Sequence, residues 1–232
     1  VVLDAGIENH NSTIVFRGGD NGRPQNFWND SASAEHLTIK SVLNQGDIEI
    51  FGMTAGYDTA AVVDPTYGHR AWIDYAVERN PGITVFIAIP QVDFPANWEQ
   101  LAADFGYTTF QDFYGAFVNM VHDSIVEPLR LEFPNTKIFS IPTGWASVEL
   151  TQMKLDDELL DDIGLMGAKP TSLFTDQKGH QGQIIIETGS LVWLNSIYGV
   201  DLSTNTYNTG FNTDLHAVAQ RVVVNHDPNY RQ

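Results

Sequence analysis

Short apolar runs alternate along the chain with segments in which apolar residues recur at helical spacing. Most of the runs are continuous rather than alternating, which is typical of strands buried on both faces of a sheet. The predicted strands cover residues 13–16, 47–53, 83–89 and 137–141. Strands and helices that follow one another in this order predict a mostly parallel α/β sheet with helices on both faces.

Helices are predicted where apolar residues recur every three or four positions, and several end at proline or glycine. The predicted helices cover residues 34–43, 71–77, 110–133, 181–198 and 213–224. The acidic stretch 155–162 is interpreted as the solvated face of a further helix. Because no linker, repeat or low-complexity tract divides the sequence, a single domain over residues 1–232 is predicted.

Composition narrows the classes of function. The net charge is −17, from 29 acidic and 12 basic residues. A nucleic-acid partner would need a basic surface, so none is expected. No apolar run reaches the roughly 18 residues of a membrane span, so no membrane partner is expected either. The chain has no cysteine, which excludes disulfides, thiolate metal sites and cysteine nucleophiles. Bacterial export to a secreted or periplasmic location is compatible with this composition but is not fixed by it.

Ligands of open α/β sheets bind at the carboxyl ends of the strands, so the segments that follow the predicted strands are candidates for chemistry. These segments are residues 17–22, 54–58, 90–93 and 142–144. Gly18-Gly19-x-x-Gly22 lacks the pattern of a nucleotide-binding loop. The helix start predicted after it could still offer backbone N–H groups to a developing negative charge, which is oxyanion binding.

A carboxylate and an imidazole lie four residues apart at Asp176 and His180, just before a long apolar helix. A carboxylate that accepts the imidazole N–H fixes its tautomer, which allows histidine to act as a general base. The alternative is a helix-capping Asp176 beside a surface histidine. No other histidine pairs in a metal-ligand spacing, so no dedicated transition-metal site is expected. Trp98 is interpreted as a core or rim aromatic, with carbohydrate stacking as its alternative.

The segment 176–198 resembles the last conserved block of SGNH (GDSL-type) hydrolases, in which a D-x-x-H motif precedes the final helix. Here the spacing is D-x-x-x-H, one residue longer. The loop that contains Gly19 and Gly22 occupies the place of the family's oxyanion block, and Gly22 matches best. Gly52-Met53-Thr54 stands where the family has Gly-x-Asn-Asp, with Thr54 at the asparagine position. That departure changes the donor to a hydroxyl or a backbone N–H.

This resemblance implies a three-layer, flavodoxin-like fold and a serine esterase or carbohydrate deacetylase. His180 would act as general base, Asp176 would orient it, and Gly19, Gly22 and Thr54 would bind the oxyanion or substrate. The substrate would be a small-molecule or polysaccharide acyl ester, and acyl transfer of this kind needs no cofactor or metal.

The family's opening strand, which ends in the nucleophilic serine, is not recognisable in this chain. Residues 1–10 resemble the tail of the helix that follows that strand, so the first strand and its serine are expected upstream. An upstream segment or a second chain would then complete the sheet. The serines of the chain lack the strand-turn-helix setting of a nucleophile; those considered are Ser31, Ser33, Ser41, Ser140, Ser147 and Ser172. Two alternatives remain open, a non-catalytic carbohydrate-binding or structural relative and an unrelated flavodoxin-like ligand binder.

Overall fold

The computed structural model describes residues 1–56 and 59–232 and shows a mixed α/β protein. Its described residues form two compact units, each considered by itself. The β1–β3 unit consists of Asn11–Ile89 and Asn119–Ser140, with Gln232. The α8 unit consists of Val1–His10, Pro90–Val118 and Ile141–Arg231. None of the helices in these residues combines the length and apolar character that crossing a bilayer would require.

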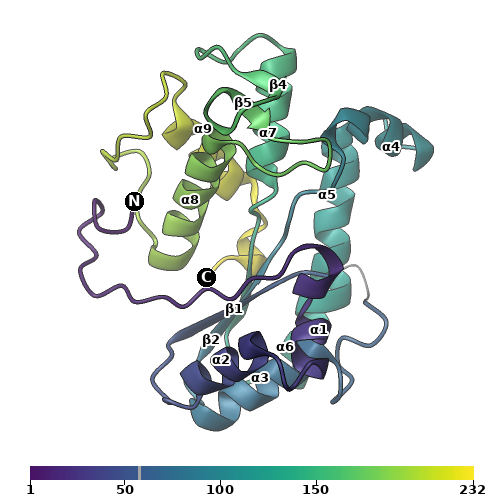
Figure 1. Ribbon diagram of the computed structural model, residues 1–232, viewed down its shortest axis with the longest axis vertical. Helices are drawn as coiled ribbons and strands as arrows, with labels where there is room; N and C mark the ends of the chain where they lie inside the picture. Colours follow the sequence, from purple (N-terminus) through teal and green to yellow (C-terminus); the bar gives the residue numbers. More distant parts are fainter. Residues whose placement is uncertain (57–58) are drawn as a thin grey trace. The chain divides into compact units, whose positions relative to one another are not determined.

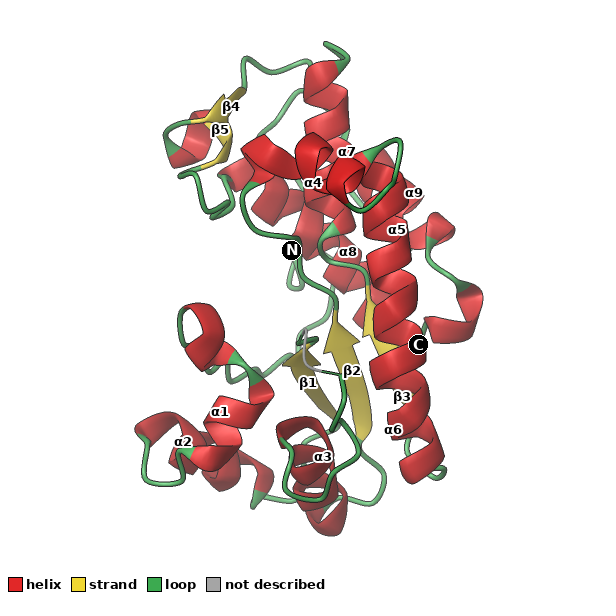
Figure 2. Ribbon diagram, turned by 90° about the vertical axis from the view of Figure 1, so that its right-hand side faces the viewer, coloured by secondary structure: helices red, strands yellow, loops and turns green. Residues whose placement is uncertain are grey.

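A small sheet with strand order β1-β2-β3 forms the centre of the β1–β3 unit. β1 and β2 run parallel, with Ile50 opposite Thr84 and Thr54 opposite Ala88 (Figure 2). The strands are β1 (Ile50–Thr54), β2 (Thr84–Ala88) and β3 (Ile138–Ile141). All four residues of β3 and most of β2 are buried, as their continuous apolar sequences predict. Three of the predicted strands are therefore confirmed, with shorter bounds.

Helices surround this sheet and agree closely with the helical spacing of the sequence. They are α1 (Pro24–Asn29), α2 (Ala34–Leu43), α3 (Gly68–Arg79), a π-helical segment (His122–Val126) and α6 (Glu127–Glu132). α2 has the predicted bounds because the Ser33 hydroxyl accepts the backbone N–H of His36 and caps the helix. The π-helical turn precedes Pro128, which cannot donate a backbone hydrogen bond within a regular helix.

The α8 unit is mainly helical, with a two-stranded parallel sheet in which Gly164 pairs with Ser172 (Figure 1). Its elements are α4 (Trp98–Asp104), α5 (Phe110–Val121, through Val118), α7 (Trp145–Leu155), β4 (Gly164–Met166), β5 (Ser172–Phe174), α8 (Gln183–Tyr198) and α9 (Leu215–Asn225). α8 packs against α9 and α7. It ends at Gly199, whose positive φ of 65° closes the helix without the strain that a side chain would add.

Several sequence predictions are wrong in this structure. Residues 13–16 are extended but are not a strand, and residues 1–10 form turns instead of the tail of a helix. The acidic stretch 155–162 is not a helix either. α7 ends at Leu155, and Asp157 takes a positive φ of 55°. The end of α7 is physically reasonable, because aspartate favours turns over helix interiors.

Trp98 lies at the start of α4 and is almost fully buried, so it offers no face for stacking on a sugar. Its ring stacks on that of Phe110, with 4.2 Å between the ring centroids. The indole N–H donates a hydrogen bond to the Val92 carbonyl at 3.1 Å. Trp98 is therefore a core residue and not a platform for carbohydrate stacking.

Candidate functional site

The Asp176–His180 segment is a short closed loop between β5 and α8. Its base is fixed by two backbone hydrogen bonds, from Thr175 N–H to the His180 carbonyl (2.7 Å) and from Gly182 N–H to the Leu173 carbonyl (2.6 Å). A Cβ at Gly182 would collide with the backbone carbonyl of Ser172. This contact explains why glycine precedes α8 and why the loop turns so tightly.

Asp176 holds the His180 ring in one orientation. One carboxylate oxygen, Oδ1, accepts the backbone N–H of Gly179 (3.1 Å) and that of His180 (3.3 Å). The other, Oδ2, accepts the His180 Nδ1–H. The hydrogen bond from the His180 side chain has the largest effect and lowers the pKa of Asp176; burial opposes it, and the two backbone donors lower the pKa further. Asp176 is therefore ionised at neutral pH, so Nδ1 carries the proton in neutral His180.

The second ring nitrogen of His180, Nε2, is then a base with an available lone pair. No residue in the described part of the chain hydrogen-bonds to it, and 68% of the side chain is exposed. The helix-capping alternative for Asp176 is wrong, because α8 begins only at Gln183 and its cap residue, Gly182, makes no side-chain cap. The predicted pairing forms despite the longer spacing of the motif.

A partly buried polar network in the α8 unit supports this loop. Gln91 donates from Nε2 to the Gly179 carbonyl, immediately before His180 in the chain. Its Oε1 accepts the Ser147 hydroxyl and the Gln181 side-chain amide, the latter at 3.1 Å. Sequence reasoning did not assign a role to Gln91, although it lies in the segment 90–93 after a predicted strand. Its partners lie 56 to 90 residues away along the chain, so no local pattern could reveal them.

The serines nearest to this loop in sequence or contact have structural roles. Ser147 is fully buried and donates to Gln91. Ser172 is also buried, and its hydroxyl lies within hydrogen-bonding distance of the Ala168 carbonyl (2.8 Å) and the Phe174 carbonyl (2.9 Å). Neither hydroxyl is accessible as a nucleophile in this conformation.

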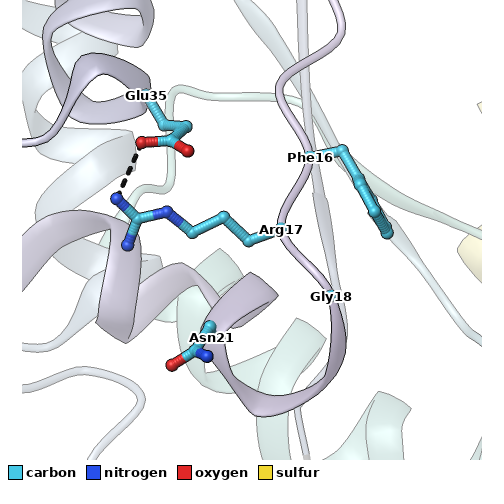
Figure 3. Close-up of a pocket in the computed structure, with 5 residues that line it drawn as sticks. All are labelled: Phe16, Arg17, Gly18, Asn21 and Glu35. Carbon is cyan, nitrogen blue, oxygen red and sulfur yellow. Dashed lines mark hydrogen bonds and ion pairs between the residues drawn. The ribbon is translucent and has the colours of Figure 1, made fainter.

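The predicted oxyanion glycines belong to the β1–β3 unit and not to the α8 unit. Gly19 and Gly22 bound a four-residue 3₁₀ turn, and a Cβ at Gly22 would collide with the Arg17 carbonyl. Beside this turn lies an open cavity of about 460 Å³ (Figure 3). Its lining residues are Phe16, Arg17, Gly18, Asn21 and Glu35. The short helix α1 that follows begins with Pro24, which has no N–H to offer an anion.

Arg17 occupies this cavity with its charge already paired. Its guanidinium donates to Glu35 at 2.8 Å and to Asp30 at 2.9 Å. The hydrogen bond from Arg17 lowers the pKa of Glu35, so that carboxylate is ionised at neutral pH. Arg17 is thus paired with two carboxylates, so the cluster carries a net charge of −1 and the cavity is not a basic anion site.

Thr54, the third predicted oxyanion residue, ends β1. Its carbonyl accepts the Nε2–H of His69 at 3.2 Å. Burial lowers the pKa of His69 to about 4, so the ring is neutral at pH 7. Its Nδ1 is buried without a hydrogen-bond partner among the described residues. The last two residues of the predicted segment 54–58, Tyr57 and Asp58, lie outside the described residues.

Of the predicted site residues, the structure therefore brings Asp176 and His180 together, and the α8 unit alone sets their geometry. Within the described residues, no group of three or more histidines or carboxylates could hold a metal ion. No protein-family model matches the chain, and comparison with curated proteins and with solved structures gave no match either.

Proposed function

We propose that this chain is the base-bearing part of a serine esterase or carbohydrate deacetylase of the SGNH type, on a three-layer, flavodoxin-like fold. The observation that carries the proposal is the Asp176–His180 pair. An ionised carboxylate holds Nδ1, while Nε2 faces solvent. A loop fixed at both ends and supported by Gln91 keeps this arrangement in place.

In the proposed reaction, His180 Nε2 takes the proton of a serine hydroxyl as the serine oxygen attacks the acyl carbonyl. Asp176 stabilises the imidazolium that forms, through the Nδ1–H hydrogen bond. The tetrahedral intermediate collapses when His180 returns the proton to the departing alcohol. Water, activated by the same nitrogen, then releases the acid and regenerates the serine. The serine is proposed to come from a segment or chain other than residues 1–232.

The test is acyl-ester turnover by the protein as its source produces it, with any segment joined or bound to it identified by intact mass. A fluorophosphonate serine probe reports the nucleophile independently of the substrate. His180→Ala should abolish both labelling and turnover, and Asp176→Asn should reduce turnover strongly because the carboxylate no longer fixes the tautomer. His10→Ala, which changes an exposed histidine of the same unit bonded to Tyr198, should leave both unchanged. Turnover that survives His180→Ala would refute the proposal.

One observation favours a second candidate, a non-catalytic carbohydrate-binding relative on the same scaffold. The hydroxyls of Ser147 and Ser172 are buried in structural hydrogen bonds, so His180 has no reactive partner among them. Polysaccharide binding without probe labelling or ester turnover, unchanged by His180→Ala, would support this candidate against the esterase.

A further inference from the structure

The outer edge of β1 has backbone groups with no hydrogen-bond partner among the described residues. Glu49 accepts the Thr84 N–H at 2.9 Å, and the Ala55 N–H donates to Ala88 at 2.8 Å, so the odd-numbered residues of β1 face β2. Residues of a parallel strand turn alternately to its two sides, so Ile50, Gly52 and Thr54 direct their N–H and C=O groups outward. Of these outward groups, only the Thr54 carbonyl has a partner among the described residues, the His69 ring.

The side chains also distinguish this edge from the opposite edge of the sheet. Every residue of β3 is buried, whereas Gly52 and Thr54 of β1 are exposed and Ile50 and Phe51 are partly exposed. An uncovered strand edge of this kind is a template for pairing with another extended segment.

The same unit also carries an extended segment that lacks a sheet. Residues 13–16 have the sequence Thr-Ile-Val-Phe, which favours β structure. Ile14 is 88% exposed and Phe16 is 79% exposed. No backbone hydrogen bond joins residues 13–16 to any other described residue. Apolar β-forming side chains so exposed are typical of an interaction segment.

The carboxyl end of this segment is anchored. Arg17 is tied to Asp30 and Glu35, and its carbonyl packs against Gly22 so closely that no side chain fits there. These contacts fix the position of Arg17, while residues 13–16 are extended and make no backbone hydrogen bond to their own sheet among the described residues. Within its described residues, the unit thus presents both a four-residue extended segment and the outer edge of β1, which is five residues long.

We propose that two copies of this chain associate by exchanging this segment, so that residues 13–16 of each copy pair with the outer edge of β1 in the other. A two-fold pair satisfies both features at once, because each copy supplies one strand and one edge. The inference does not use the proposed catalytic pair, Asp176 and His180, which lies in the α8 unit.

The first test is sedimentation velocity of the chain over a range of concentrations, at about 0.15 M and about 1 M salt. The high-salt arm is needed because a net charge of −17 opposes association and salt screens it. The wild-type chain should dimerise. Val15→Pro should shift the dimer to monomer, because proline removes a donor from the exchanged strand. Val15→Thr, which keeps the N–H and the β-branched shape, should remain dimeric. A monomeric wild-type chain, or a dimer unaffected by Val15→Pro, would overturn the proposal.

The absence of cysteine allows a second test that detects pairing between copies only. One chain carries Ile50→Cys, and the other carries a single cysteine in place of Thr13, Ile14, Val15 or Phe16. At least one of the four mixtures should form the mixed disulfide dimer under mild oxidation, and its position reports the register. Leu37→Cys, an exposed apolar residue on α2 of the same unit, is the matched control and should not cross-link. If all four mixtures behave like this control, the exchange does not occur.

Discussion

His69 provides a direct test of how burial controls the stability of the β1–β3 unit. Its ring is neutral in the folded protein because burial lowers its pKa from 6.5 to about 4. The unfolded chain exposes the ring to water, where its pKa has the ordinary value of about 6.5. As pH falls below 6.5, the unfolded state takes up a proton that the folded state refuses, so the free energy of unfolding decreases.

The size of the effect follows from the two pKa values. Above pH 7 both states are neutral and His69 has no pH-dependent effect. At pH 5 the titration of His69 lowers the free energy of unfolding by about 2 kcal/mol relative to neutral pH, and below pH 4 this loss levels off at about 3 kcal/mol. Stability from this group is therefore present at neutral pH and is lost between about pH 6.5 and pH 4.

The assay is urea denaturation of the wild-type chain and of His69→Gln between pH 7.5 and pH 4.5. Gln keeps a side-chain N–H for the Thr54 carbonyl but does not titrate. The difference in unfolding free energy between the two proteins cancels the titration of their shared carboxylates. That difference should shift in favour of His69→Gln by about 2 kcal/mol between pH 7.5 and pH 5. Parallel pH dependence in the wild type and His69→Gln would refute the reasoning.

Two further predictions concern the α8 unit. Gly182→Ala should destabilise the chain by roughly 3 kcal/mol or prevent folding, because its Cβ would collide with the Ser172 carbonyl. The control Gly115→Ala, in α5, has room for a Cβ and should be neutral or stabilising by up to about 1 kcal/mol. Thermal unfolding compares the two variants, and equal melting temperatures would contradict the prediction. Asp161→Ala should destabilise the chain by roughly 1–3 kcal/mol, because this carboxylate accepts hydrogen bonds from the backbone and side chains of Asn212 and Thr213. Burial raises the pKa of Asp161, but these donors outweigh it and lower the pKa overall. Denaturant unfolding measures the loss beside the neighbouring control Asp162→Ala, and equal losses of stability in the two variants would contradict the prediction.

Local sequence patterns predicted well those elements whose boundaries are set locally. α2 has the predicted bounds because its N-cap, Ser33, is adjacent in sequence. The central strand β2 follows from a continuous apolar run that is buried. Residues 13–16 have the composition of a strand, but a strand also requires a neighbour, and no propensity reports whether one is present. The same pattern therefore predicts β2 correctly and residues 13–16 wrongly.

In the candidate site, too, contacts between residues close in sequence could be predicted and long-range contacts could not. Asp176 and His180 are close in sequence, so their pairing could be predicted from the motif. Gln91 could not be identified, because its hydrogen bond to the Gly179 carbonyl joins residues 88 positions apart in the sequence. The orphan nitrogen of His69 is equally invisible in the sequence, since burial depends on packing over the whole unit.

His69 and His180 show that a lone pair alone does not make a histidine a base. Both rings donate one N–H to a protein oxygen and keep the other nitrogen unpaired among the described residues. At His69 the free nitrogen is buried, so a proton there would create a charge without water or a carboxylate beside it. At His180 the charge would be shared with Asp176 and with solvent. Burial therefore argues against a base role for His69 and leaves the exposed, carboxylate-paired His180 as the proposed base.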